Sequence, residues 1–246
     1  IDFLDDFKRD LDGSIRDIAG RATLTVSNFL KQRNRLYPCF KKSVPHPFTA
    51  FTTTLDDGHS LDMEVLELMD KSAPRAIHLD LSSSECATGF AMVHVPALKD
   101  ILKTKETLDE LGNKRLLKVT ETLPVYRTDL ALQIVAPTGG EIIYAQIRNL
   151  IYQLRELGFC IDMITADQYQ SKDTLQILYD NGFSTNHLSI DLDIEIYRNL
   201  RNAIYEDRFE CADHPILQDE LIHLEENFKK RKIEKKPNKS KDVSDA

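Results

Sequence analysis

Apolar and polar residues follow two different periods after about residue 75. Short apolar runs bounded by turn residues predict strands at 76–81, 88–95, 126–136, 160–166 and 185–190. Apolar residues at helical spacing predict helices at 141–158, 172–181, 194–206 and 215–227. Gly158 and Gly182 are suited to end two of these helices, and Ser171 to cap one. Strands that alternate with helices after an initial hairpin predict an α/β domain with a mixed sheet.

The pattern is less regular in residues 1–70. Helical stretches are expected around 5–18 and 25–33, and three prolines then mark irregular chain. We therefore predict an extension or linker over 1–70 and the α/β domain over 71–246. The charged stretch 98–117, which leucines punctuate, is expected to be either a helix or a surface insertion.

Acidic residues occur where the predicted regular structure meets turns. Asp80 interrupts an apolar strand, Asp167 ends another, and Asp242 and Asp245 lie in the last residues, SKDVSDA. An ionised carboxylate in a buried strand needs a cationic partner or loses its charge. Because strand ends gather at one edge of an α/β sheet, these side chains are candidates to converge there.

Oxygen ligands of this kind suit Mg²⁺ or Mn²⁺. Two such ions roughly 4 Å apart can support phosphodiester hydrolysis. Three carboxylates about 5 Å apart, at an effective dielectric near 20, repel by on the order of 10 kcal/mol in total. That repulsion rivals the net stability of a domain, so ions or protons would have to offset it.

Each acidic residue also has a purely structural interpretation. Asp80 is compatible with a water-facing position on an edge strand, and Asp167 with an Asx turn leading to Ser171. Asp242 is compatible with a first-turn residue that the helix dipole favours, after an N-cap at Ser240. Spacing alone leaves these alternatives open.

Composition narrows the function classes. A hydrophobic fraction of 41% suffices for an ordinary core, and no apolar segment is long enough to span a membrane. The start of the chain does not resemble a signal peptide, so we expect a cytoplasmic location. No phosphate-binding P-loop or serine-hydrolase elbow occurs in the sequence.

Cysteine and histidine spacings do not suggest zinc. The four cysteines are expected to be reduced core residues, namely Cys39, Cys86, Cys160 and Cys211. Four histidines are expected at surface or capping positions, namely His78, His187, His214 and His223.

The net charge of −8 argues against a protein that is basic throughout, but one basic run lies near the end. Its residues are Lys229, Lys230, Arg231, Lys232, Lys235, Lys236, Lys239 and Lys241. A solvated tail is one interpretation of this run. A β-hairpin or mobile loop that grips a phosphate backbone is the other.

The order of several segments resembles the nuclease domain of the large terminase subunit of tailed bacteriophages. These segments include AIHLDLSSSECATGFA, PTGGEIIYAQIRNLIYQLRELGF, the D-x-x-Q-S motif at 167–171 and SKDVSDA, and the resemblance spans about 75–246. It implies a ribonuclease H-like α/β fold with a central mixed sheet of five or more strands flanked by helices. The segment FKRDLDGSIRDIAG and Pro47 resemble the connection to an ATPase domain.

The resemblance also implies a site and a function. Asp80, Asp167 and Asp242 would be the catalytic metal ligands, with Asp245 as the alternative or additional ligand, holding two Mg²⁺ or Mn²⁺ ions. The implied activity is endonucleolytic cleavage of concatemeric double-stranded viral DNA during genome packaging, in the host cytoplasm. Implied partners are DNA, the portal protein and the small terminase subunit, and we expect the isolated domain to be a monomer that does not bind membranes.

Two other functions remain open at this point. One is a junction resolvase or transposase-type nuclease with the same fold, which would prefer branched DNA. The other is a docking module of the packaging motor that has no catalytic activity.

Overall fold

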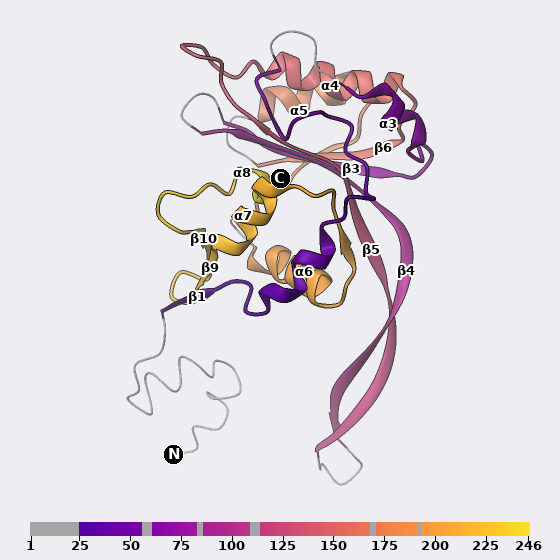
Figure 1. The fold of residues 1–246 in the computed structure, drawn as a ribbon, viewed down its shortest axis with the longest axis vertical. Helices are drawn as coiled ribbons and strands as arrows, with labels where there is room; N and C mark the ends of the chain where they lie inside the picture. Colours follow the sequence, from indigo (N-terminus) through magenta and orange to yellow (C-terminus); the bar gives the residue numbers. More distant parts are fainter. Residues whose placement is uncertain (1–24, 56–60, 83–85, 109–113, 168–170, 191–192) are drawn as a thin grey trace.

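The computed structural model describes residues 25–55, 61–82, 86–108, 114–167, 171–190 and 193–246. Its centre is a seven-stranded mixed sheet in the order β2-β5-β4-β3-β6-β7, with β8 paired to β5 (Figure 1). The strands are β2 (Thr52–Thr53), β3 (Arg75–Asp80), β4 (Thr88–Leu108), β5 (Lys114–Ile134), β6 (Ile161–Ala166), β7 (Thr185–His187) and β8 (Phe209–Glu210). The predicted hairpin of β3 and β4 is confirmed, since these strands pair antiparallel while β3 and β6 pair parallel.

Helices cover both faces of this sheet (Figure 1). On one face lie α3 (Met63–Leu68), α4 (Tyr144–Glu156) and α5 (Lys172–Asp180). On the other lie α6 (Ile194–Tyr205), α7 (Pro215–His223) and α8 (Asp242–Asp245). The expected mixed α/β sheet with flanking helices is therefore confirmed.

Alternation along β3 separates two hydrophobic cores. Ile77 and Leu79 are fully buried in the core beneath α4, to which Ile147 and Leu150 also contribute. The residues that alternate with them in β3, His78 and Asp80, therefore point toward the face with α6, α7 and α8. Gly158, with φ +94°, takes the left-handed conformation just after α4, as predicted.

Residues 25–55 contribute to both cores. Phe29 and Leu36 are buried in the core beneath α6, and Phe48 and Leu55 in the core beneath α4. The helix expected at 25–33 is wrong: Val26–Asn28 form strand β1, and Arg33–Arg35 a short 3-10 turn. The helix expected at 5–18 lies outside the described residues. The domain boundary near residue 70 stays a prediction.

A second, three-stranded sheet explains why the helix expected at 215–227 is shorter than predicted. β1 pairs with β9 (Leu224–Asn227), and β9 pairs with β10 (Lys232–Lys235), both antiparallel. The helix expected to reach 227 therefore ends at His223, because pairing on both sides draws 224–227 into a strand. The strand expected at 185–190 is also shorter, ending at His187.

The stretch 98–117 is not a helix. Its described residues belong to β4 and β5, which continue beyond the body as a long two-stranded ribbon (Figure 1). Cross-strand contacts fix the register, including Lys105 to Glu121 and Thr122 to Asp100. The leucine spacing suited a helix, but pairing of 98–108 with 114–124 makes both segments strands, so the surface-insertion alternative holds.

The cysteines divide between two environments. Cys39 and Cys211 are buried, as expected, whereas Cys86 and Cys160 are exposed, which corrects the expectation of four core residues. All four are free thiols. No described helix is long and apolar enough to cross a membrane.

Candidate acidic site at the sheet edge

Strand pairing brings Asp80 and Asp167 together. β3 lies inside the sheet, between β4 and β6, so Asp80 is not on an edge strand. Leu79 of β3 pairs with Ala166 of β6 in a parallel ladder. Asp80 follows Leu79 as the last residue of β3, and Asp167 follows Ala166 directly after β6. Both therefore lie at the carboxyl ends of neighbouring parallel strands. Asp167 also accepts a hydrogen bond from the Ser189 hydroxyl, at 3.2 Å.

Gly89 allows α8 to lie directly on this part of the sheet. It pairs with Asp80 across the β3–β4 ladder, so both positions point to the same face. A Cβ on Gly89 would lie 1.8 Å from the carbonyl oxygen of Asp242. The main chain of α8 therefore occupies the space that a side chain at position 89 would fill. Asp242 lies over Gly89 and its cross-strand partner Asp80.

Glu220 of α7 holds the beginning of α8. Its buried carboxylate accepts hydrogen bonds from the Ser240 hydroxyl and the Ser244 amide, each at 2.7 Å. The N-cap of α8 is Lys241, so the cap expected at Ser240 is wrong. A carboxylate from another helix satisfies the free N–H group instead. Ser171 is the N-cap of α5, as expected, but its hydroxyl donates to the carbonyl oxygen of Asp167.

The acidic residues affect one another electrostatically. The pKa of Asp80 is raised to about 7, mainly by burial and then by the charges of Asp245, Asp242 and Asp167, while Lys241 opposes them. Burial also raises the pKa of Asp242, against Lys235 and a hydrogen bond with Gln133. The edge-strand position that the purely structural interpretation required is wrong, because β3 lies between β4 and β6.

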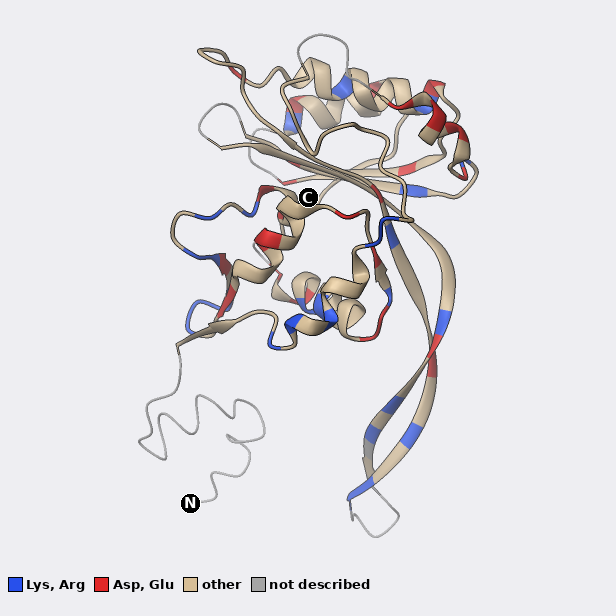
Figure 2. Ribbon diagram, in the orientation of Figure 1, with Lys and Arg blue, Asp and Glu red and all other residues tan. Residues whose placement is uncertain are grey.

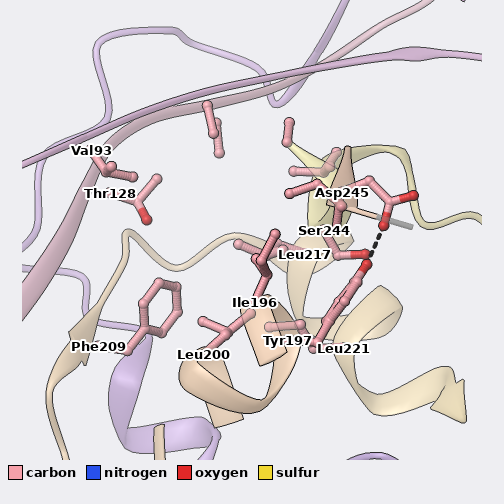
Figure 3. A pocket seen from close by; sticks show the side chains of 15 residues that line it. Val93, Thr128, Ile196, Tyr197, Leu200, Phe209, Leu217, Leu221, Ser244 and Asp245 are labelled. Carbon is pink, nitrogen blue, oxygen red and sulfur yellow. Dashed lines mark hydrogen bonds between the residues drawn. The ribbon is translucent and has the colours of Figure 1, made fainter. Parts of the chain in front are cut away.

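Asp245 is held at the margin of an apolar cavity of about 180 Å³ (Figure 3). The Tyr197 hydroxyl donates a hydrogen bond to its Oδ1 atom, and Lys241 Nζ lies 2.7 Å from its Oδ2 atom. Figure 3 shows Tyr197 reaching from α6 to this carboxylate, with Leu217 and Leu221 of α7 lining the same cavity. Asp245 thus occupies a fixed position between α6 and the start of α8.

The chain was compared with protein families, curated sequences and solved structures, and only solved structures match it. No protein-family model and no curated protein sequence matches the chain. The large terminase of bacteriophage HK97 matches with a TM-score of 0.50 at 12% identity, over 89% of this chain and 42% of that one. The large terminase nuclease from thermophilic phage G20c matches with a TM-score of 0.47 at 10% identity, over 71% of this chain and 78% of that one.

The fold of this chain is similar to that of the matched part of the HK97 large terminase. At such low identity the likeness concerns the fold alone, and it agrees with the expected mixed α/β sheet flanked by helices. The positions of individual carboxylates follow from the strand pairing and helix contacts of this chain.

His78 lies near the site, although the sequence analysis did not connect it with Asp80. It lies two residues before Asp80 in β3 and therefore on the same face of the sheet. Its Nδ1 atom is 2.7 Å from the Thr165 hydroxyl, and its Nε2 atom is buried without a hydrogen-bond partner. The expectation of a surface or capping residue is wrong for His78 but holds for His214, which caps α7. The available signal was the i, i+2 spacing to Asp80.

The donor atoms suit a divalent cation, although they do not form a closed ligand set. Among the described residues, no three His, Cys, Asp or Glu side chains are already grouped tightly enough to hold a metal ion. The cluster nevertheless offers carboxylate oxygens in excess of nearby positive charge, beside the unpartnered Nε2 of His78. Hard oxygen donors of this kind favour Mg²⁺ or Mn²⁺ over zinc.

The basic run forms the turn after β9, strand β10 and the segment that leads to α8, so part of it belongs to a β-hairpin, one of the two interpretations of the run. Several lysines are already in ion pairs: Lys230 with Glu234, Lys236 with Glu225, Lys239 with Asp219, and Lys241 with Asp245. Lys229, Arg231 and Lys235 are exposed. Figure 2 shows basic residues gathered around this hairpin and its connection to α8.

Replacing Gly89 with Ala should displace α8. The new methyl group would overlap a backbone oxygen, which cannot rotate away, so we expect a loss of about 1–3 kcal/mol in the free energy of unfolding. Urea denaturation measures this loss. Gly89→Ala protein as stable as wild type would contradict the close approach.

Proposed function

We propose that this chain is a divalent-cation-dependent endonuclease domain that cleaves double-stranded viral DNA during genome packaging. The observation that carries the proposal is the meeting, on one face of a fold similar to that of a large terminase, of acidic residues from three distant segments. Asp80 and Asp167 end neighbouring parallel strands, and Asp242 lies over Asp80 because Gly89 leaves room. The fold alone does not imply endonuclease activity, so the proposal depends on the acidic side chains that gather at one place on it.

The proposal assigns Asp80, Asp167 and Asp242 as catalytic metal ligands and Asp245 as a further ligand. Bound Mg²⁺ or Mn²⁺ would supply an activated water and stabilise the leaving oxygen of the phosphodiester. The chain itself positions the oxygen donors: β3 and β6 fix two of them, and Glu220 with Gly89 fixes the start of α8. The partial burial of Asp80 strengthens its interaction with a cation, because water screens the charge less.

The β9–β10 hairpin and the segment to α8 are proposed to hold the DNA backbone. The proposed contacts are Lys229, Lys230, Arg231, Lys232, Lys235, Lys236, Lys239 and Lys241. Lys235 already influences the pKa of Asp242, which supports a location beside the acidic residues. The ion pairs of Lys230 and Lys239 are partly exposed, so exchanging their partners for phosphates costs little.

We also propose that this domain works as part of a DNA-packaging motor. The chain spans 42% of the HK97 large terminase that it matches. An ATPase domain, the portal protein and the small terminase subunit are therefore proposed partners in the host cytoplasm, and the isolated domain is proposed to be a monomer.

Plasmid cleavage tests this function. We expect supercoiled DNA to become nicked and linear with Mn²⁺ or Mg²⁺, and to remain intact with EDTA. Asp242→Asn should abolish cleavage, and Asp219→Asn, which removes an exposed carboxylate on α7, should not. Preferential cutting of four-way junctions over linear duplex would favour a resolvase. Absence of both cleavage and Mn²⁺ binding would contradict the proposal and favour a docking module without catalytic activity.

A further inference from the structure

Lys241 places its positive charge among the acidic side chains. Its Nζ atom lies 2.7 Å from Asp245 Oδ2, and the two side chains are only 19% and 12% exposed. The neighbouring pair of Lys239 with Asp219 is much more open, with side chains 36% and 52% exposed. Two lysines separated by one residue thus have different environments, and only Lys241 is directed toward the acidic site.

The environment of Asp245 makes this ion pair replaceable. Tyr197 from α6 donates a hydrogen bond to the other carboxylate oxygen, so the position of Asp245 does not depend on Lys241 alone. A lysine ammonium ends a flexible four-carbon stem and can withdraw without moving the backbone. A divalent cation beside Asp245 would therefore compete with Lys241 for the same Oδ2 atom.

We propose that Lys241 is an internal counter-cation that competes with the divalent ion and thereby sets the affinity of the acidic site. This inference rests on the proposed function. Lys241 stabilises the cation-free protein by offsetting repulsion among the carboxylates, and it leaves Asp245 when the ion binds. Its ammonium group is then free to contact a DNA phosphate, which couples cation loading to substrate contact. Tyr197 is the positioning residue that keeps Asp245 in place during the exchange.

Calorimetric titration with Mn²⁺ alone, at pH 8, tests the competition. We expect Lys241→Met to bind Mn²⁺ at least about fivefold more tightly than wild type, because the competing charge is gone. Lys241→Arg keeps the charge and should bind like wild type. Lys239→Met is the matched control: it makes the same charge change two residues away, outside the acidic site, and should alter the affinity by less than about twofold.

Thermal unfolding in EDTA gives a readout independent of catalysis. Lys241→Met should lower the melting temperature by about 4 °C or more relative to Lys239→Met, and added Mn²⁺ should remove most of that difference. If Lys241→Met does not fold, Lys241→Gln retains a polar side chain and tests the same charge.

The outcomes separate this inference from the proposed function. Mn²⁺ binding by wild type with unchanged or weaker affinity in Lys241→Met would overturn the competition and leave the proposed function in place. No Mn²⁺ binding by wild type, together with no cleavage, would overturn both. Tighter binding by Lys241→Met but not by Lys239→Met supports the inference.

Discussion

Asp80→Asn should reduce Mn²⁺-dependent DNA cleavage by about 1,000-fold or more and, at the same time, stabilise the protein in EDTA at pH 8. Cleavage should fall because Asn provides one neutral oxygen in place of a carboxylate at the centre of the acidic site. Stability should rise because the same carboxylate is partly buried beside other negative charges. Such a trade-off is common at functional sites, where a charge that the function needs lowers the stability of the fold.

The direction of the stability effect follows from the pKa of Asp80. The native value of about 7 lies above the ordinary value of 3.8 that applies to the unfolded chain. Between these values the native state binds more protons, so the free energy of unfolding falls as the pH rises through the window and stays low above it. At about 1.4 kcal/mol per pKa unit, the ionised side chain costs up to about 4 kcal/mol at pH 8. Asn removes this cost at pH 8 and changes little below pH 4.

Urea denaturation in EDTA at pH 8 and pH 4 measures the stability effect, and plasmid nicking measures cleavage. Asp219→Asn is again the control, because Asp219 is exposed and pairs with Lys239 away from the cluster. Wild-type cleavage by Asp80→Asn would end the catalytic assignment. A stability gain equally large at both pH values would show that charge is not its cause.

The largest loss of stability is expected from the buried ion pair of Arg75 and Asp129. The Nε atom of Arg75 lies 2.8 Å from Asp129 Oδ2, and the side chains are 0% and 4% exposed. His94 Nδ1 lies 2.7 Å from the same oxygen, so the contact joins β3, β4 and β5. Asp129→Asn leaves the Arg75 guanidinium buried without a counter-charge. We expect it to lower the free energy of unfolding by about 3–5 kcal/mol.

Chemical denaturation checks this loss, and a surface pair provides the comparison. Arg35 and Asp207 are 3.5 Å apart, with side chains 47% and 52% exposed, so Asp207→Asn should cost less than about 1 kcal/mol. Replacing both buried partners, as Arg75→Met with Asp129→Leu, should recover part of the stability, because no lone charge remains. Equal losses for Asp129→Asn and Asp207→Asn would contradict the importance of burial.

Several elements could be predicted from local periodicity. The alternation in β3 and the helical spacing in α4 reflect which side chains are buried, and each element has only one core to face. Asp80 was identifiable because a charge within an apolar strand conflicts with burial. For the basic run, a β-hairpin was one of the interpretations left open, and the structure places part of the run in β10, paired with β9, which was predicted to be helical.

Other elements depended on partners that a local pattern does not contain. Residues 98–108 became a strand because 114–124 pair with them, and 224–227 left the helix because β1 and β10 lie on either side. Propensity is weak compared with a full ladder of backbone hydrogen bonds, so tertiary pairing decides such segments.

The sequence alone determined which residues carry the charges: Asp80 and Asp167 at strand ends, and Asp242 and Asp245 in the final residues. Only the tertiary structure decided which of them meet and what holds them. The parallel register aligns Asp80 with Asp167, the missing side chain of Gly89 admits α8, and Tyr197 and Lys241 bind Asp245. These contacts join residues far apart in the chain, and no local pattern encodes a distance of closest approach between two backbones.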